Sequence, residues 1–163
     1  MTPDHARLFA FESDFVATLR CIPMAVRLKL DTCGIKLSLR QWSRFTKQDR
    51  RVLLLAACAT DGEIAAYRAG LEDLVQARAG ETAKPIAPLP LTLWEDAGGP
   101  ARIVVAYAAS LGLIPPTTAQ WRRLTPLERF TLIKLTRDNH DNVNFAPAMT
   151  EFGLGRPAER AAA

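Results

Sequence analysis

The sequence predicts an all-α fold in which two pseudo-repeated helical bundles pack into one globular unit. First, apolar residues recur at helical spacing behind residues that start helices, such as Ser38 and Thr46. Second, glycines such as Gly34 and Gly112 stand where these helices should end. Third, the pattern W-x-x-[FL]-T-x-x-[DE]-R occurs twice, beginning at Trp42 and again at Trp121.

The composition is that of an ordinary globular protein. The chain has 163 residues, of which 48% are hydrophobic and 23% are charged. No apolar run reaches the roughly 18 residues of a membrane span, and the first residues lack the order of a secretory signal. We therefore expect a cytoplasmic protein without membrane contact. Three cysteines without a CxxC pair or a cysteine–histidine cluster argue against a disulfide framework and against a metal site.

Residues 1–80 should form the N-terminal helical half, and the most unusual part of it is the segment 8–45. Proline is pre-set for the first position of a helix, and glycine commonly follows the last one. Pro23 and Gly34 therefore predict a helix that runs from Pro23 to about Thr32.

After a short helix capped by Ser38, two further helices are expected in this half. Thr46 stands three residues before Asp49, which indicates a capping box that opens a helix. The run 52–58 leaves that helix little polar face, so we expect its end to be buried. A turn at 60–62 should then lead into an amphipathic helix that ends near Gly80.

The second half is expected to follow a linker. Three prolines predict a semi-extended linker over residues 81–99. Residues 100–155 should form the C-terminal helical half, in which one short helix carries Trp121 and the next opens at Thr125. Residues 156–163 should be a disordered tail.

The positive charge is concentrated near the start of the chain. Six basic and three acidic residues leave the segment 8–45 with +3 of the formal net charge of +4. Such a bias can favour an anionic partner, but a solvated helix face is the preferred interpretation of the charge alone.

Two cysteines are the first candidates for chemistry. Cys21 and Cys33 flank the same predicted helix, so they should lie about 18 Å apart, too far for a disulfide. The helix C-terminus should raise the pKa of Cys33, whereas Cys21 follows Arg20 and precedes a helix N-terminus, where a thiol is more reactive. Inert packing is the preferred interpretation of both thiols, and more so of Cys33. The sequence contains no catalytic-triad order, phosphate-binding loop or zinc-protease motif, so we expect a non-catalytic protein.

The segment 8–45 also carries a family resemblance. Its core, LRCIPMAVRLKLDTCGIKLSLRQW, is preceded by a stretch of the form FxFExDF, and NFAPAMTEFG follows near the end of the chain. These stretches resemble the signature of the nitrate reductase-associated proteins, the NarM-type nitrate reductase maturation factors.

The resemblance implies an accessory factor needed for active assimilatory, molybdenum-containing nitrate reductase. The expected partner is the nitrate reductase apoenzyme. No cofactor should be bound stably, and a transient contact with a molybdenum cofactor is left open. The predicted partner-binding residues lie in the signature and are Arg20, Cys21, Arg27, Lys29, Asp31, Cys33 and Lys36.

Three other functions fit parts of the sequence. A helical nucleic-acid-binding module would use the basic bias, but the charge is weak and no basic stripe joins the two halves. A small-ligand sensor or enzyme would use Cys21 as a reactive thiol. A helical scaffold protein would need none of these features.

Overall fold

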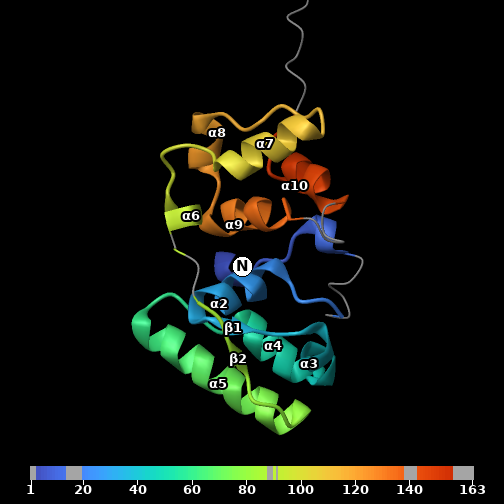
Figure 1. The fold of residues 1–163 in the computed structure, drawn as a ribbon, viewed down its shortest axis with the longest axis vertical. Coiled ribbons are helices and arrows are strands. Elements are labelled where there is room, and N and C mark those ends of the chain that lie inside the picture. The colour runs from blue at the N-terminus through green and yellow to red at the C-terminus, as the bar shows by residue number, and fades with distance from the viewer. Residues whose placement is uncertain (1–2, 14–19, 88–89, 91, 138–142, 156–163) are drawn as a thin grey trace, which may run out of the picture. The chain divides into compact units, whose positions relative to one another are not determined.

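The structure is a computed structural model, and it describes residues 3–13, 20–87, 90, 92–137 and 143–155. The chain separates into two compact units, Met1–Pro90 and Leu91–Ala163. The described residues of both units are mostly helical (Figure 1), which confirms the helical class. That the two halves pack into one globular unit stays a prediction. Nowhere in the described ranges is a helix both long enough and apolar enough to cross a membrane.

The N-terminal unit is built on one long helix, α5. Three shorter helices, α2, α3 and α4, each contact α5, and α2 also contacts α4. Its elements are η1 (Asp4–Ala6), η2 (Ala10–Glu12), α2 (Met24–Cys33), β1 (Ile35–Lys36), α3 (Leu39–Arg44), α4 (Lys47–Leu55), α5 (Asp61–Ala79) and β2 (Lys84–Pro85).

Capping residues place the helix ends in this unit close to where the sequence predicts them. Gly34 ends α2 with a φ of 75°, a left-handed conformation that favours glycine. The hydroxyl of Thr46 accepts a hydrogen bond from the Asp49 amide at 3.0 Å, and the Asp49 carboxylate accepts one from the Thr46 amide at 2.8 Å. The predicted turn at 60–62 is wrong, because Thr60 caps α5 and the helix already begins there.

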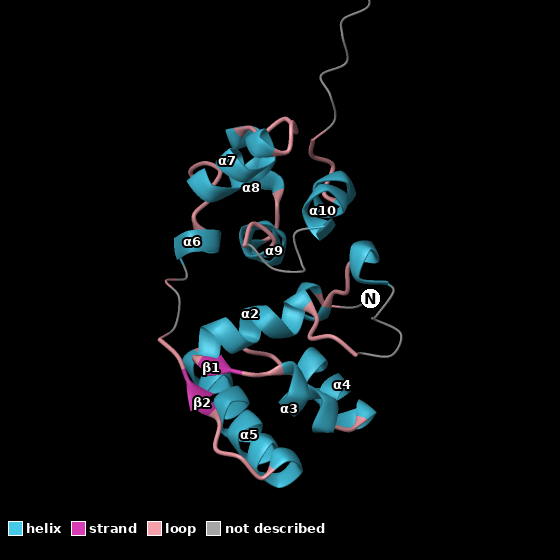
Figure 2. Cartoon of the chain, turned by 45° about the vertical axis from the view of Figure 1, so that its right-hand side comes forward, coloured by secondary structure: helices cyan, strands magenta, loops and turns pink. Residues whose placement is uncertain are grey.

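The predicted linker over residues 81–99 contains the boundary between the two units, but parts of it form regular structure within them. Lys84 and Pro85 pair with β1 in an antiparallel register that joins Ile35 to Pro85 (Figure 2). The amide of Ile86 also donates to the Gly34 carbonyl at 2.9 Å. The proline is tolerated because it lies at the edge of a two-stranded sheet, where its missing N–H costs no hydrogen bond within a sheet interior.

The end of α4 is also more exposed than the sequence predicts. Leu53 and Leu54 are buried, but Val52 is 52% exposed and Leu55 is 47% exposed. The reason is that η1, α2 and α5 contact only part of the circumference of α4. An apolar strip of this helix therefore remains on the surface of the unit.

The C-terminal unit is built around α9, which contacts α6, α7 and α10. Trp94 is 2% exposed and packs edge-on against Phe130, with ring centroids 5.1 Å apart. Part of the predicted linker therefore belongs to the core of this unit. The predicted tail, residues 156–163, lies outside the described residues. The elements are α6 (Thr92–Glu95), α7 (Arg102–Ser110), α8 (Thr118–Arg123), α9 (Pro126–Lys134) and α10 (Phe145–Glu151).

The motif that occurs twice in the sequence forms similar local hydrogen bonds in both units. Trp42 and Trp121 are fully buried. Arg50 donates to the Trp42 carbonyl at 3.1 Å, and Arg129 donates to the Trp121 carbonyl at 3.3 Å. Outside this motif the units differ, because the described residues of the C-terminal unit include no counterpart of the sheet or of the 19-residue helix α5. The structure therefore shows a shared corner, and a repetition of whole bundles is not shown.

Candidate functional site

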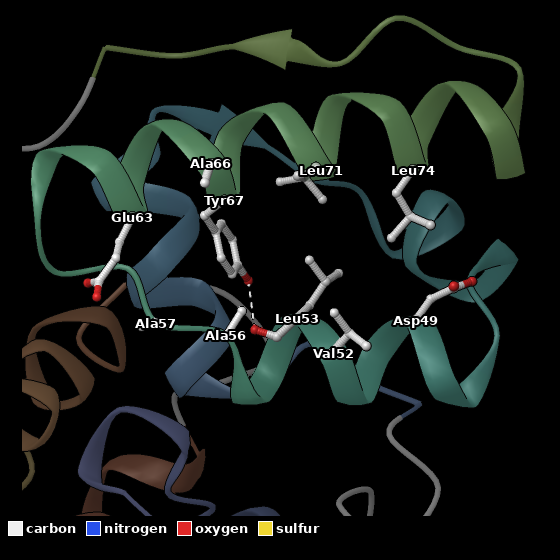
Figure 3. A pocket seen from close by; sticks show the side chains of 11 residues that line it. Asp49, Val52, Leu53, Ala56, Ala57, Glu63, Ala66, Tyr67, Leu71 and Leu74 are labelled. Atoms are coloured by element: carbon white, nitrogen blue, oxygen red, sulfur yellow. Dashed lines mark hydrogen bonds between the residues drawn. The ribbon is translucent and has the colours of Figure 1, made fainter.

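An open apolar groove lies between α4 and α5 in the N-terminal unit. Its volume is about 460 Å³, which lies within the range of small-ligand pockets. Figure 3 shows Val52 and Leu53 of α4 facing Leu71 and Leu74 of α5. The lining residues are Asp49, Val52, Leu53, Ala56, Ala57, Glu63, Ala66, Tyr67, Gly70, Leu71 and Leu74.

Two buried side chains hold the C-terminal end of α4 in place beside this groove. The Tyr67 hydroxyl donates to the Leu53 carbonyl at 3.0 Å (Figure 3). The Lys29 ammonium donates to the Leu54 carbonyl at 2.6 Å and to the Leu53 carbonyl at 3.4 Å. These are carbonyls of the last turn of the helix, which have no partner within the helix itself. The groove therefore has a wall that is tied to both α2 and α5.

The electrostatics beneath the groove are governed by burial. Burial lowers the pKa of Lys29 to about 8, and the neighbouring Cys58 acts in the opposite direction. Burial raises the pKa of Cys58 to about 11 and raises the pKa of Tyr67 well above its usual value. Both of these acids are therefore neutral near pH 7, and the Cys58 thiol is not activated as a nucleophile.

A carboxylate stands at each end of the groove (Figure 3). Partial burial raises the pKa of Asp49, but hydrogen bonds from Arg78 and Thr46 outweigh it and hold the pKa below its usual value. Backbone hydrogen bonds from Thr60 and Ala59 lower the pKa of Glu63. Both groups are ionised near pH 7, and both are already engaged in capping helices.

The predicted partner-binding residues do not form one surface. Lys29, Asp31 and Cys33 are only 4%, 8% and 3% exposed, so their prediction as contact residues is wrong. Lys29 is buried because the carbonyls of Leu53 and Leu54 accept hydrogen bonds from its ammonium group, so this basic residue need not face water. Arg20 and Lys36 are exposed.

Cys21 and Arg27 are intermediate in exposure. The Arg27 guanidinium donates to the Ile22 carbonyl at 3.2 Å, so it is partly engaged in holding the start of α2. The Cys33 thiol lies 3.6 Å from the Leu30 carbonyl, and burial raises its pKa. This direction agrees with the sequence-based expectation, although burial rather than the helix terminus is the main cause.

One functional feature of the signature was not anticipated. Glu12, in the FxFExDF stretch, is 1% exposed. Its carboxylate accepts from the Phe9 amide at 3.1 Å and from the Met24 amide at 2.8 Å, at the N-terminus of α2. The sequence does contain a signal for this contact: an acidic residue stands between aromatic residues, and a helix that begins after a proline follows. Much of the signature therefore serves to assemble the N-terminal unit.

No cluster of three or more metal-ligating side chains occurs in the part of the chain that the structure describes. What the described residues offer is a binding surface: a groove with apolar walls, a fixed helix end and ionised groups at its margins.

Fold and groove together define a class, that of a mostly helical protein of two units whose N-terminal unit presents an open apolar groove. The profile of the conserved nitrate reductase-associated proteins matches residues 8–152, and the chain belongs to this family. No match was found among curated proteins or among solved structures.

Proposed function

We propose that this protein is an accessory factor that brings assimilatory, molybdenum-containing nitrate reductase to its active state by binding the immature enzyme. The family profile carries this proposal, because it spans residues 8–152 and includes both compact units. The protein acts as a non-catalytic assembly factor in the cytoplasm, and its partner is the apoenzyme.

The character of the groove favours a protein partner over the cofactor itself. A molybdenum cofactor carries phosphate, which is held best by several cations or by helix N-termini. The groove between α4 and α5 has apolar walls, and the charged side chains that line it are the carboxylates Asp49 and Glu63. Apolar side chains of a polypeptide fit such walls better than a phosphate does. Contact with the cofactor is therefore brief and indirect, through the reductase.

Deletion of the gene tests the function. We expect normal amounts of nitrate reductase protein with low activity and low molybdenum content, restored by the wild-type gene. Loss of the reductase protein itself would indicate that the factor protects the apoenzyme from degradation. Full activity and full molybdenum content in the deletion strain would rule the proposal out.

Of the predicted contact residues, Arg20 and Lys36 are exposed and Cys21 is intermediate in exposure. Cys21 gives a second test of the function. Cys21→Ser should restore the deletion strain as well as wild type if the protein is not a thiol enzyme or thiol sensor. Failure of Cys21→Ser, with normal protein levels, would favour the alternative in which Cys21 is a reactive group.

A further inference from the structure

We propose that the exposed face of α4 is the surface that binds the immature reductase, and that it takes a segment with acidic side chains next to large apolar ones. We call this face the α4 surface and define it by Lys47, Arg51, Val52 and Leu55. The inference rests on the proposed function for the identity of the partner.

The charge of the protein is concentrated around this helix. Residues 38–55 contain five basic residues and one acidic residue, and this excess of +4 equals the formal net charge of the whole chain. Part of the charge is used internally. Arg50 donates to the carbonyls of Trp42 and Ser43, and Arg40 forms an ion pair with Glu81.

Lys47 and Arg51 are different, because both are exposed and neither forms a hydrogen bond or an ion pair with a described residue. They are four residues apart on α4 and therefore lie on the same side of the helix. The nearby acid Asp49 is held by Arg78 through two hydrogen bonds of 2.8 and 3.2 Å. Two unpaired cations one turn apart attract carboxylates and steer an acidic partner toward this face.

Apolar surface lies directly beside these cations. Val52 and Leu55 are about half exposed, at 52% and 47%. On one side of α4, Val52 and Leu53 line the groove that faces α5. On the other side is a second hollow of about 480 Å³, lined by Ala6, Arg7, Leu8, Arg51, Leu54 and Leu55. The helix is thus a ridge between two hollows that can receive large apolar side chains.

Side chains from other elements of the unit hold the C-terminal end of α4 in place. A ring nitrogen of His5 lies 3.2 Å from the Leu55 carbonyl, and Lys29 donates to the Leu54 carbonyl. The Arg7 guanidinium stacks over the Phe9 ring, 4.9 Å from its centroid, and this fixes a cationic group at the second hollow. A surface that is ordered before binding loses less conformational freedom when it binds.

The mixture of groups favours a polypeptide over a nucleic acid. Binding to nucleic acid depends mainly on many phosphate contacts from basic side chains. The α4 surface has only two unpaired cations, and it alternates them with apolar residues and hollows. Apolar cores surrounded by charged groups are typical of protein interfaces, where arginine is enriched.

A double charge reversal, Lys47→Glu with Arg51→Glu, tests the surface in the full-length protein. The matched control is Lys84→Glu with Arg102→Glu, which reverses the charge of two exposed basic residues outside α4. Affinity for purified apo-nitrate reductase is measured by biolayer interferometry at two salt concentrations. We expect the double variant on α4 to bind at least about tenfold more weakly, with a weaker dependence on salt, and the control to match wild type.

A second variant, Val52→Glu, tests the apolar component. It should weaken binding at high salt, where the effect of Lys47 and Arg51 is already screened. Wild-type affinity in both the double variant and Val52→Glu would overturn the α4 surface while leaving the proposed function intact. Salt-sensitive binding of the wild type to duplex DNA that disappears in the double variant would overturn the choice of a protein partner.

If the wild type does not bind apo-reductase at all, the proposed function fails and a different probe decides the surface. A designed helical peptide with one leucine face and otherwise glutamate is titrated into ¹⁵N-labelled full-length protein. A second peptide carries lysine in place of glutamate. Saturable shifts of the Arg51 and Leu55 amides with the glutamate peptide alone support the surface. No saturable shift, or equal shifts with both peptides, overturns it.

Discussion

A lysine and a glutamate are buried at two helix ends of the N-terminal unit, where polar side chains satisfy backbone groups. Lys29 donates to carbonyls at the end of α4, and Glu12 accepts from the first amide of α2. Burying a charge is costly unless hydrogen bonds compensate for it. Both residues belong to the family signature, and their measurable effect should therefore be on stability.

Lys29 should make the stability of the protein depend on pH in a particular direction. Its pKa is about 8 in the folded state, against 10.5 for an ordinary lysine. Between these values the unfolded state binds more protons, so stability rises as pH increases. From pH 8 to pH 9 the wild type should gain about 1 kcal/mol relative to Lys29→Met.

This prediction is checked by urea denaturation of both proteins at each pH. Burial raises the pKa values of Cys33 and Cys58, and this acts in the opposite direction. Because the charge of Lys29 lowers the pKa of Cys58, both proteins are compared in a Cys58→Ser background, and the effect of Cys33 is common to both. A difference between the two proteins that is constant from pH 7 to pH 9 would contradict the assignment of Lys29 as a buried, titrating group.

Glu12→Gln should destabilise the protein by about 1–2 kcal/mol, because the charged acceptor is lost and the new amide nitrogen faces backbone donors. The control is Glu72→Gln on α5. Glu72 forms an exposed ion pair with Arg68 at 3.0 Å, and such pairs contribute little. Denaturation in urea at pH 7 should show a clear loss for Glu12→Gln and a change of no more than about 0.5 kcal/mol for Glu72→Gln.

At the scale of elements, the shared corner motif contains two arginines with unequal roles. Arg129 is 5% exposed and donates to the carbonyls of Trp94 at 2.6 Å and Trp121 at 3.3 Å. Arg50 is only partly buried in the equivalent position. When a donor is removed, water can form a hydrogen bond to a partly exposed carbonyl in its place. Water cannot reach a buried carbonyl, which then stays without a partner.

Arg129→Met should therefore cost about 2–3 kcal/mol of stability, and Arg50→Met about 1 kcal/mol. Thermal unfolding followed by circular dichroism gives the order of the two effects. Near-UV circular dichroism should also change more for Arg129→Met, because the backbone at Trp94 in α6 loses its hydrogen bond from α9. Equal losses in the two variants would show that the two corners are held in the same way.

The helix boundaries were predictable because they depend on residues close together in sequence. Thr46 with Asp49 and Thr125 with Glu128 each form a capping box within four residues, and both are present. Gly34 could be identified as the residue that ends α2 for the same reason, because this position needs a left-handed backbone conformation, which favours glycine.

The candidate site was predicted less well, because its residues depend on contacts between distant parts of the chain. Lys29 meets Leu54 across 25 positions, and Lys84 meets Lys36 across two strands of two residues each. Neither spacing leaves a periodic signal in the sequence. The groove was missed for a related reason: α5 covers only one side of α4, and the pattern of Val52 to Leu55 cannot show which side remains open.

At the scale of the whole molecule, the division at Pro90 and Leu91 separates two units that each have a core of their own. Trp42, Phe9 and Leu71 are buried in the first unit, and Trp121 and Phe130 are buried in the second. A unit with its own core can fold independently, although small units have little stability to spare.

Residues 1–90 and 91–163, produced separately, should each give a helical circular dichroism spectrum and a cooperative thermal transition. Only the first contains the α4 surface, so only residues 1–90 should bind apo-nitrate reductase, and Lys47→Glu with Arg51→Glu should weaken that binding as it does in the full chain. The fragment 91–163 serves as the control for non-specific association. Binding by 91–163 and not by 1–90 would move the partner-binding surface to the C-terminal unit, where α8 also exposes Arg122 and Arg123.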